Sequence, residues 1–274
     1  MIFDDTICTL GEGPLWHPTR NQLFWFDILE KKLHAKGRHW QFDEYVSAAG
    51  WVDDTTLIVA SQSALMRFDI ETGVHEKLVD LEADNPTTRS NDGRADPQGG
   101  FWIGTMGIDA EPHAGSIYRY YKGELREVRV EVTISNAICF SPDGRDAYYT
   151  DTPTQKILRQ PLDADGWPTP DLHVHIDLSG TEFRPDGAVV DADGNLWNAQ
   201  WGAARVAGYD PTGKFLSAFD FPASQTSCPA FGGPDLTTLY CTSAAVGLPG
   251  GADHGKTFAV TTDITGQAEH RVLL

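Results

Sequence analysis

Short apolar segments rich in β-branched and aromatic residues recur along the whole chain, and clusters of Gly, Pro and Asp separate them. Residues 115–123 (GSIYRYYKG) and 205–214 (RVAGYDPTGK) are two examples. Hardly any long segment has the period of about 3.6 residues that marks an amphipathic helix. Short strands joined by tight turns produce this pattern, so we expect an all-β protein.

The pattern also repeats along the chain. Each copy contains a distinctive polar residue, a short strand, a turn built from Pro, Asp or Gly, and a second strand rich in aromatic residues. Ungapped alignment places Pro18 and Pro234 on Pro142, whereas two copies need a turn shortened by one residue and one copy is weaker. The copies are residues 11–27, 48–61, 90–102, 135–151, 185–198 and 227–243. Six copies spaced about 40–50 residues apart predict a six-bladed β-propeller.

The even spacing bears on domain organisation. A β-sandwich followed by a second domain is the alternative, but no linker-like stretch interrupts the repeats. We therefore expect one propeller domain over residues 1–274. We also expect its first residues to pair with the C-terminal segment 269–274 (EHRVLL) and so close the ring.

One position of the repeat carries candidate chemistry. It precedes the turn by six residues in the copies that contain the turn proline. First strands line the channel of a propeller, so the residues that begin them converge at one end of the axis. Four of the five are oxygen donors, which favours a hard-cation site or a polar substrate site, although such residues also satisfy backbone groups at blade junctions. They are Glu12, Asn91, Asn136, Asp186 and Cys228.

The same frame resolves an ambiguous stretch, residues 89–102 (RSNDGRADPQGGFW). Asn-Asp-Gly usually marks a hairpin turn, but a second turn signal follows within a few residues. Because Asn91 falls on the repeat position, we expect residues 91–93 to begin the inner strand of the third blade. The turn is then expected at residues 96–100.

Charge and composition restrict the partners. The chain has 21 Lys and Arg residues against 39 Asp and Glu residues, a net charge of −18. Such a field repels nucleic acids and anionic lipids, so neither nucleic acid nor a membrane is an expected partner. No apolar run reaches the length of about 18 residues needed to span a bilayer. The N-terminal residues lack the pattern of a signal peptide, so the expected location is cytoplasmic.

The cysteines give little support for a thiolate metal site. Cys8, Cys139, Cys228 and Cys241 show no CxxC spacing. In a cytoplasmic protein we expect them to be reduced, buried and apolar in character.

Taken in order, several stretches resemble the gluconolactonase/regucalcin family of six-bladed sugar lactonases. The matching stretches are GEGPLWHP, RSNDGRADPQGGFWIGTM, GSIYRY, SNAICFSPDG with YYTDT, and RPDGAVVDADGNLW, and the late stretch PAFGGPDLTTLYCTSA resembles the bacterial aldonolactonase branch. The resemblance implies that Glu12, Asn136 and Asp186 bind a divalent cation. It also implies that Arg89 and Asn91 contact the substrate.

The resemblance extends to two further positions. A further substrate-contacting glutamate of the family corresponds to Glu111, in a loop of variable length before GSIYRY. Ala137 occupies a position where several relatives have Gly, and we expect no effect on the neighbouring ligand.

The sequence also bears on mechanism. It has no Gly-x-Ser-x-Gly motif and no credible Cys/His pair, so covalent catalysis is not expected. We predict metal-dependent hydrolysis of a sugar lactone, of pentonolactone or gluconolactone type, with Asp186 as the catalytic base. All-oxygen ligation favours Ca²⁺, Mg²⁺ or Mn²⁺ and leaves Zn²⁺ and Fe²⁺ open.

Other interpretations remain open. They are a regucalcin-like calcium-binding propeller, a non-catalytic scaffold with a structural ion, and strictosidine-synthase-like chemistry on a related propeller. We expect a monomer or a weak homodimer.

Overall fold

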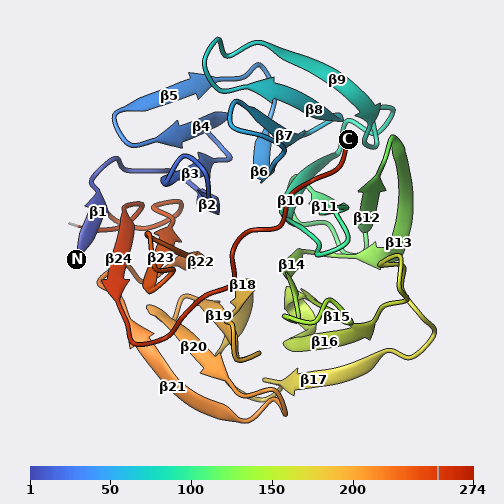
Figure 1. Ribbon diagram of the computed structural model, residues 1–274. Helices are drawn as coiled ribbons and strands as arrows, with labels where there is room; N and C mark the ends of the chain where they lie inside the picture. The colour runs from blue at the N-terminus through green and yellow to red at the C-terminus, as the bar shows by residue number, and fades with distance from the viewer. Residues whose placement is uncertain (252) are drawn as a thin grey trace.

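The structure is a computed structural model that describes residues 1–251 and 253–274. Six antiparallel sheets of four strands each form a ring around a central channel (Figure 1). This arrangement confirms the predicted all-β, six-bladed β-propeller. Among the described residues, the one helical segment is the 3₁₀ turn η1 (Thr152–Thr154), and no helix there is long and apolar enough to cross a membrane.

The first three blades follow the chain order from the innermost to the outermost strand. Blade 1 contains β2 (Gly11–His17), β3 (Gln22–Asp27), β4 (Lys32–Ala35) and β5 (Arg38–Gln41). Blade 2 contains β6 (Val46–Trp51), β7 (Thr56–Ser61), β8 (Ala64–Asp69) and β9 (His75–Asp80). Blade 3 contains β10 (Thr88–Ala95), β11 (Phe101–Gly107), β12 (Gly115–Tyr121) and β13 (Glu124–Val132).

The remaining blades follow the same order, except that the last takes its outer strand from the N-terminus. Blade 4 contains β14 (Ser135–Phe140), β15 (Asp146–Asp151), β16 (Lys156–Pro161) and β17 (His173–Asp177). Blade 5 contains β18 (Arg184–Val190), β19 (Leu196–Trp201), β20 (Arg205–Tyr209) and β21 (Phe215–Asp220). Blade 6 contains β22 (Thr226–Gly232), β23 (Thr238–Ser243), β24 (Thr257–Thr261) and β1 (Ile2–Asp4).

The apolar residues of the strands pack mainly between neighbouring blades. Phe24 and Phe26 of blade 1, for example, share a buried cluster with Val59 and Phe68 of blade 2. Each such side chain contributes about 1.5–3 kcal/mol on burial. Because every blade buries one face against the next, the ring holds the inner strands in fixed positions around the channel.

Ring closure differs from the prediction. β1 pairs with β24, so the expectation that the first residues pair with residues 269–274 is wrong. That segment instead crosses one end of the channel (Figure 1). There Val272 donates its N–H to Trp51 O, Leu273 donates to Gly99 O, and Glu269 forms an ion pair with Arg94. Burial of Val272 and this ion pair fix the segment as a cross-strap, which leaves the edge of β24 free for β1.

Each inner strand has a register shift against the second strand of its blade. In the five blades for which the sequence identified a repeat position, the shift occurs at that position, and in every blade it adds a residue to the inner strand, as in a β-bulge. The flanking residues are Glu12/Leu15, Val46/Ala48, Ser90/Gly93, Asn136/Cys139, Pro185/Ala188 and Thr226/Pro229. A bulge turns side chains out of the regular alternation, and the bulges of blades 1, 3, 4 and 5 bring Glu12, Asn91, Asn136 and Asp186 to one end of the channel.

The stretch from residue 89 to residue 102 contains a single turn, as predicted, but its inner strand begins earlier than predicted. β10 starts at Thr88 rather than at Asn91, so Arg89 is part of the strand. Residues 91–93 belong to β10, and the turn to β11 lies at residues 96–100. Asp96 Oδ1 accepts hydrogen bonds from the N–H groups of Gln98 and Gly100, at 2.9 and 2.8 Å. The aspartate therefore fixes the turn, and Asn91 is free to face the channel.

Candidate active site

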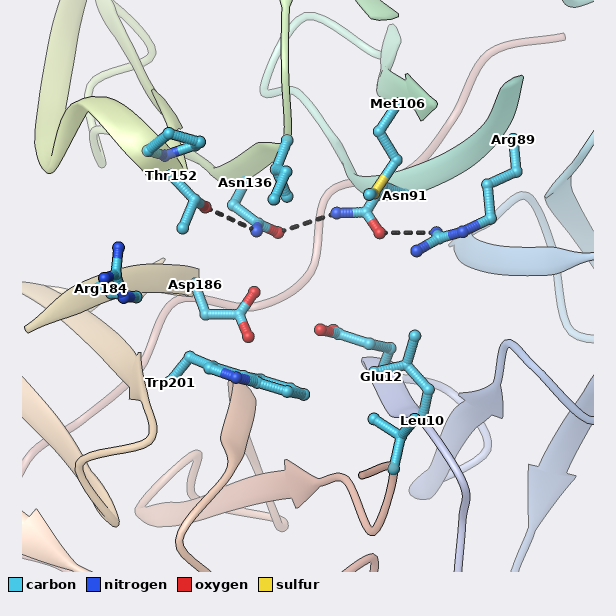
Figure 2. Close-up of a pocket in the computed structure, with 13 residues that line it drawn as sticks. Leu10, Glu12, Arg89, Asn91, Met106, Asn136, Thr152, Arg184, Asp186 and Trp201 are labelled. Atoms are coloured by element: carbon cyan, nitrogen blue, oxygen red, sulfur yellow. Dashed lines mark hydrogen bonds between the residues drawn. The ribbon is translucent and has the colours of Figure 1, made fainter. Parts of the chain in front are cut away.

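The bulges surround a pocket of about 370 Å³ at the end of the channel opposite the cross-strap (Figure 2). Its polar lining residues are Glu12, Arg89, Asn91, Asn136, Thr152, Arg184 and Asp186. Its apolar lining residues are Leu10, Met106, Ile134, Pro153, Trp201 and Val246. A polar floor beneath a largely apolar rim is the usual composition of a small-molecule site.

Two buried carboxylates form the floor of the pocket. Glu12 is 6% exposed and Asp186 is 5% exposed, and their carboxylates face each other in Figure 2. Burial and repulsion by Asp92 raise the pKa of Glu12 to about 8, against attraction by Arg89. Burial, followed by repulsion from Glu12, raises the pKa of Asp186 well above its usual range. The site therefore holds two acids at a cost that a cation would relieve.

The local backbone explains how Glu12 reaches the pocket. Gly13 has a φ of +52° and donates its N–H to Glu12 Oε2 at 3.1 Å. A Cβ at Gly13 would lie 2.2 Å from Ser47 O, so glycine is needed both for the left-handed backbone and for the contact with blade 2. Ala137, next to Asn136, has a φ of +57°, which is consistent with glycine being accepted at that position.

A line of hydrogen bonds orients the two asparagines. Thr152 donates its hydroxyl to Pro185 O at 2.8 Å, so its oxygen accepts from Asn136 Nδ2 at 3.0 Å. Asn136 Oδ1 then faces the pocket and accepts from Asn91 Nδ2 at 3.1 Å. Asn91 Nδ2 also donates to Ser135 O at 2.8 Å. The line joins blades 3, 4 and 5 and fixes which amide atom each asparagine presents.

Arg89 continues this line. Its Nη1 donates to Asn91 Oδ1 at 2.8 Å and to Ser90 O at 2.9 Å. Burial lowers the pKa of Arg89 to about 10, while the neighbouring Glu12 opposes that shift, and the guanidinium stays charged at neutral pH. It is therefore a fixed donor at the wall of the pocket.

A third acid lies behind the pocket wall. Asp92 is buried, and its Oδ2 accepts a hydrogen bond from Ile138 N at 2.7 Å. Burial raises the pKa of Asp92 to about 6, and its charge contributes to the raised pKa values of Glu12 and Asp186. The hydrogen bond joins blades 3 and 4, so Asp92 holds the bulges together rather than lining the cavity.

The donor set fits one hard cation. In the part of the chain that the structure describes, no group of three or more His, Cys, Asp or Glu side chains is placed to bind a metal ion. A cation in this pocket would instead be held by two carboxylates and one amide oxygen, from Glu12, Asp186 and Asn136. Hard divalent cations take such all-oxygen ligands, and the uncompensated burial of both carboxylates favours a positive charge between them.

Two sequence-predicted positions lie outside the pocket lining. Glu111 is exposed, and its Oε2 accepts a hydrogen bond from Asp109 N at 3.1 Å, so its role in substrate binding stays a prediction. Cys228 is buried where blades 5 and 6 meet, and a Cβ on Gly187 would lie 2.3 Å from its Sγ. The repeat position in blade 6 therefore fills space, and all four cysteines are free and buried as expected.

Three residues that line the pocket were not in the predicted set of site residues. Thr152 lies in η1 and orients Asn136, and it is the last residue of the stretch YYTDT noted in the sequence. Arg184 precedes Asp186 by two residues in RPDG. Trp201 reaches the pocket from the end of β19.

Comparison with known proteins adds an independent line of evidence. The profile of the SMP-30/gluconolactonase/LRE-like region matches residues 10–245. A 6-deoxy-6-sulfogluconolactonase of Pseudomonas putida is 35% identical over 95% of this chain and 94% of its own. An L-arabinolactonase of Azospirillum brasilense is 36% identical over 90% of this chain and 85% of its own. A solved structure described as a calcium-binding protein, regucalcin, from Agrobacterium tumefaciens has a TM-score of 0.96 and 41% identity, and covers 100% of this chain and 97% of its own.

Proposed function

Because the chain belongs to the SMP-30/gluconolactonase/LRE-like family, we propose that it hydrolyses a sugar lactone to the free sugar acid with one bound divalent cation. One observation carries the proposal. Two buried carboxylates and an oriented amide oxygen converge on an open pocket, and no ion pair within residues 1–251 and 253–274 engages either carboxylate. Such an arrangement lowers the stability of the fold, so stability does not explain it. Acids with perturbed pKa values in a cleft are typical of functional sites.

The proposed cation is held by Glu12, Asn136 and Asp186, where it would polarise the lactone carbonyl and acidify water. Its identity is open among Ca²⁺, Mg²⁺, Mn²⁺, Zn²⁺ and Fe²⁺, with oxygen ligation favouring the first three. Thr152 keeps the amide oxygen of Asn136 turned toward the pocket. The protein thus supplies a preset ligand geometry.

Asp186 is the proposed base. One of its oxygens accepts a proton from water as the water oxygen attacks the lactone carbonyl carbon. When the ring C–O bond breaks, the same proton passes to the departing alkoxide, so the carboxylate is regenerated. Burial raises the pKa of Asp186 above its usual range in the metal-free protein, which makes it a stronger base than an exposed carboxylate.

Arg89 and Asn91 are proposed to hold the substrate. The guanidinium of Arg89 is the one fixed positive side chain at this wall, so it is placed to donate to the developing oxyanion or to ring hydroxyls. Trp201 offers an apolar surface to the ring. Pentonolactones and gluconolactones both remain candidates, since one relative is named for arabinolactone and another for a sulfonated gluconolactone.

A lactone panel tests the proposal. Purified protein is mixed with glucono-, xylono-, arabino- and galactonolactone, and proton release is followed with and without EDTA, against protein-free samples that correct for spontaneous hydrolysis. We expect release on at least one lactone, its loss with EDTA, and its return when one divalent cation is restored. No proton release on any lactone with any of the five cations would refute the proposal.

A second candidate is a calcium-binding role without catalysis, which the description of the regucalcin structure favours. Calcium binding with micromolar affinity, together with inactivity on the whole panel, is the result that would support it.

A further inference from the structure

Arg184 differs from the other charged residues of the pocket. It is exposed, and within residues 1–251 and 253–274 its side chain forms neither a salt bridge nor a hydrogen bond to protein. Acidic residues outnumber basic ones 39 to 21, so a guanidinium without an acidic partner is unexpected here. Arg89, by contrast, is bonded to Asn91 and Ser90.

The backbone places Arg184 beside the reacting groups. Arg184 and Asp186 are two residues apart on β18, a spacing of about 6.5 Å along a strand. The bulge between Pro185 and Ala188 breaks the regular alternation there, and both residues line the pocket. Arg184 also pairs directly with Trp201 across β18 and β19. Figure 2 shows both side chains on the same side of the pocket as Asp186. A substrate ring against Trp201, with its ester at Asp186, would extend its far end toward Arg184.

A second hollow adjoins the pocket at this point. Arg184 and Trp201 line both the pocket and a neighbouring surface cavity of about 630 Å³. The other charged residues of this cavity are two acids, Glu182 and Asp220, and one base, Arg205, which lies over the Phe183 ring at 3.8 Å. Since Arg205 is already engaged with Phe183, Arg184 is, among the described lining residues, the cation at the junction of the two cavities that has no protein partner.

The local charge also favours an anion. Within the pocket lining, Glu12 and Asp186 balance Arg89 and Arg184, so a bound divalent cation leaves the lining positive. Asp92, buried behind the wall, reduces this excess without cancelling it. The net charge of −18 on the whole chain contributes little at this site, because salt largely screens charges that lie more than about 8 Å away.

Resting on the proposed lactonase function, we propose that Arg184 determines specificity for a lactone that carries an anionic group on the carbon chain away from the ester. A guanidinium presents two parallel N–H donors that match the oxygens of a carboxylate, phosphate or sulfonate. Trp201 holds the ring between the ester at Asp186 and this anionic group. The chemical class is thus an acidic sugar lactone.

The test compares matched substrates. D-Glucono-1,5-lactone, its 6-phosphate, its 6-sulfonate and a glucarolactone are assayed with the wild-type protein and with the variants R184Q and R184K. We expect R184Q to lower the ratio of kcat/KM for the preferred anionic lactone to that for the neutral lactone by about tenfold or more. R184K keeps the charge but not the planar donor pair, so its kcat/KM ratio should lie between those of the wild type and R184Q. The best of the three anionic substrates identifies the acidic group.

Arg145 provides a matched control. It is exposed at the turn between β14 and β15, where its partner is Asp143, and R145Q removes the same charge away from the pocket. R145Q should leave both kcat/KM values unchanged. Equal losses on neutral and anionic lactones in R184Q, or no loss on either, would overturn the proposal.

A binding experiment separates this proposal from the lactonase function. If no lactone is hydrolysed, the lactonase proposal fails, and calorimetric titration of gluconate and 6-phosphogluconate into wild-type and R184Q protein still tests Arg184. Tighter binding of the phosphorylated acid to the wild type, lost in R184Q, supports the specificity role. Equal affinities in both proteins refute it.

Discussion

The two ends of the central channel differ in how their buried ionisable groups are paired. At the pocket end, Glu12 and Asp186 face each other and repulsion adds to burial in raising their pKa values. At the other end, burial alone would lower the pKa of Arg94, but attraction to Glu269 outweighs it and leaves the pKa raised. The same channel therefore contains charges that destabilise the fold and charges that are paired.

This difference separates function from stability. A buried charge with a partner can be explained by the fold, whereas two buried acids that face each other without a cationic partner require another explanation. A cation-dependent site supplies that explanation, because the bound ion compensates both carboxylates. The comparison predicts that one type of substitution, acid to amide, will have opposite consequences at the two ends.

The largest effect is expected at the pocket end. Asp186→Asn removes the proposed base and one cation ligand, so kcat/KM on the best lactone should fall by about 10³-fold or more. Thermal unfolding of the metal-free variant should occur no lower than that of the wild type, because a buried acid that is desolvated and repelled by Glu12 is replaced by a neutral amide. Steady-state kinetics and circular dichroism measure the two quantities.

Asp165→Asn is the control for that substitution. Asp165 is exposed in the turn at residues 163–166, so the variant changes the net charge without touching the pocket. It should keep wild-type activity. Activity of Asp186→Asn within tenfold of the wild type would contradict the assigned role.

The next largest effect is expected at the strapped end. Glu269→Gln leaves the charge of Arg94 buried without its partner, so the free energy of unfolding should fall by about 3 kcal/mol. Neither residue lines the pocket, and kcat/KM at 15 °C should stay close to the wild-type value. Urea unfolding measures the loss.

The double variant R94M/E269L tests the cause of that loss. Replacing both members of the pair by apolar residues removes the stranded charge, so most of the lost stability should return. If the double variant is as unstable as Glu269→Gln, the loss comes from the missing contacts of the ion pair and not from a stranded charge on Arg94.

The channel shows how far the sequence could predict the structure. The repeat predicted six blades, and it singled out Glu12, Asn136 and Asp186, because positions that begin equivalent inner strands converge by symmetry. The structure brings these three together in one pocket. The repeat could not predict that Cys228, at the same position, packs against Gly187 instead.

The strap shows why the rest could not be predicted. Residues 269–274 look like a closing strand, since they contain apolar residues at the end of the chain. Their path depends on Arg94, which lies 175 positions earlier and becomes a partner only after the ring forms. Arg184 and Thr152 were missed for a similar reason, because their roles come from neighbours in space rather than from the repeat.

A smaller effect is expected from pH. The pKa of Glu12 is raised from 4.5 to about 8, so the folded protein retains a proton that the unfolded chain releases. This carboxyl therefore stabilises the metal-free fold fully below pH 4.5, and its contribution is lost as the pH rises toward 8. The slope for one such proton is about 1.4 kcal/mol per pH unit.

Urea unfolding at pH 5, 6, 7 and 8 measures that slope. The metal-free wild type should lose stability relative to Glu12→Gln across this range, and a saturating divalent cation should reduce the difference. Parallel stability curves for the two metal-free proteins would show that Glu12 is already compensated, and the contrast between the two ends would disappear.

The smallest effect is expected outside the pocket, at Glu111. Its carboxylate is exposed and accepts a hydrogen bond from Asp109 N, a bond that the amide oxygen of glutamine can also accept. Glu111→Gln should therefore change kcat/KM by less than about threefold, in line with other exposed substitutions. Steady-state kinetics on the best lactone, with Glu131→Gln as an exposed control, measures the change. A drop of more than tenfold in Glu111→Gln alone would mean that the loop at residues 108–114 closes over the bound substrate and adds a third acid to the open end of the channel.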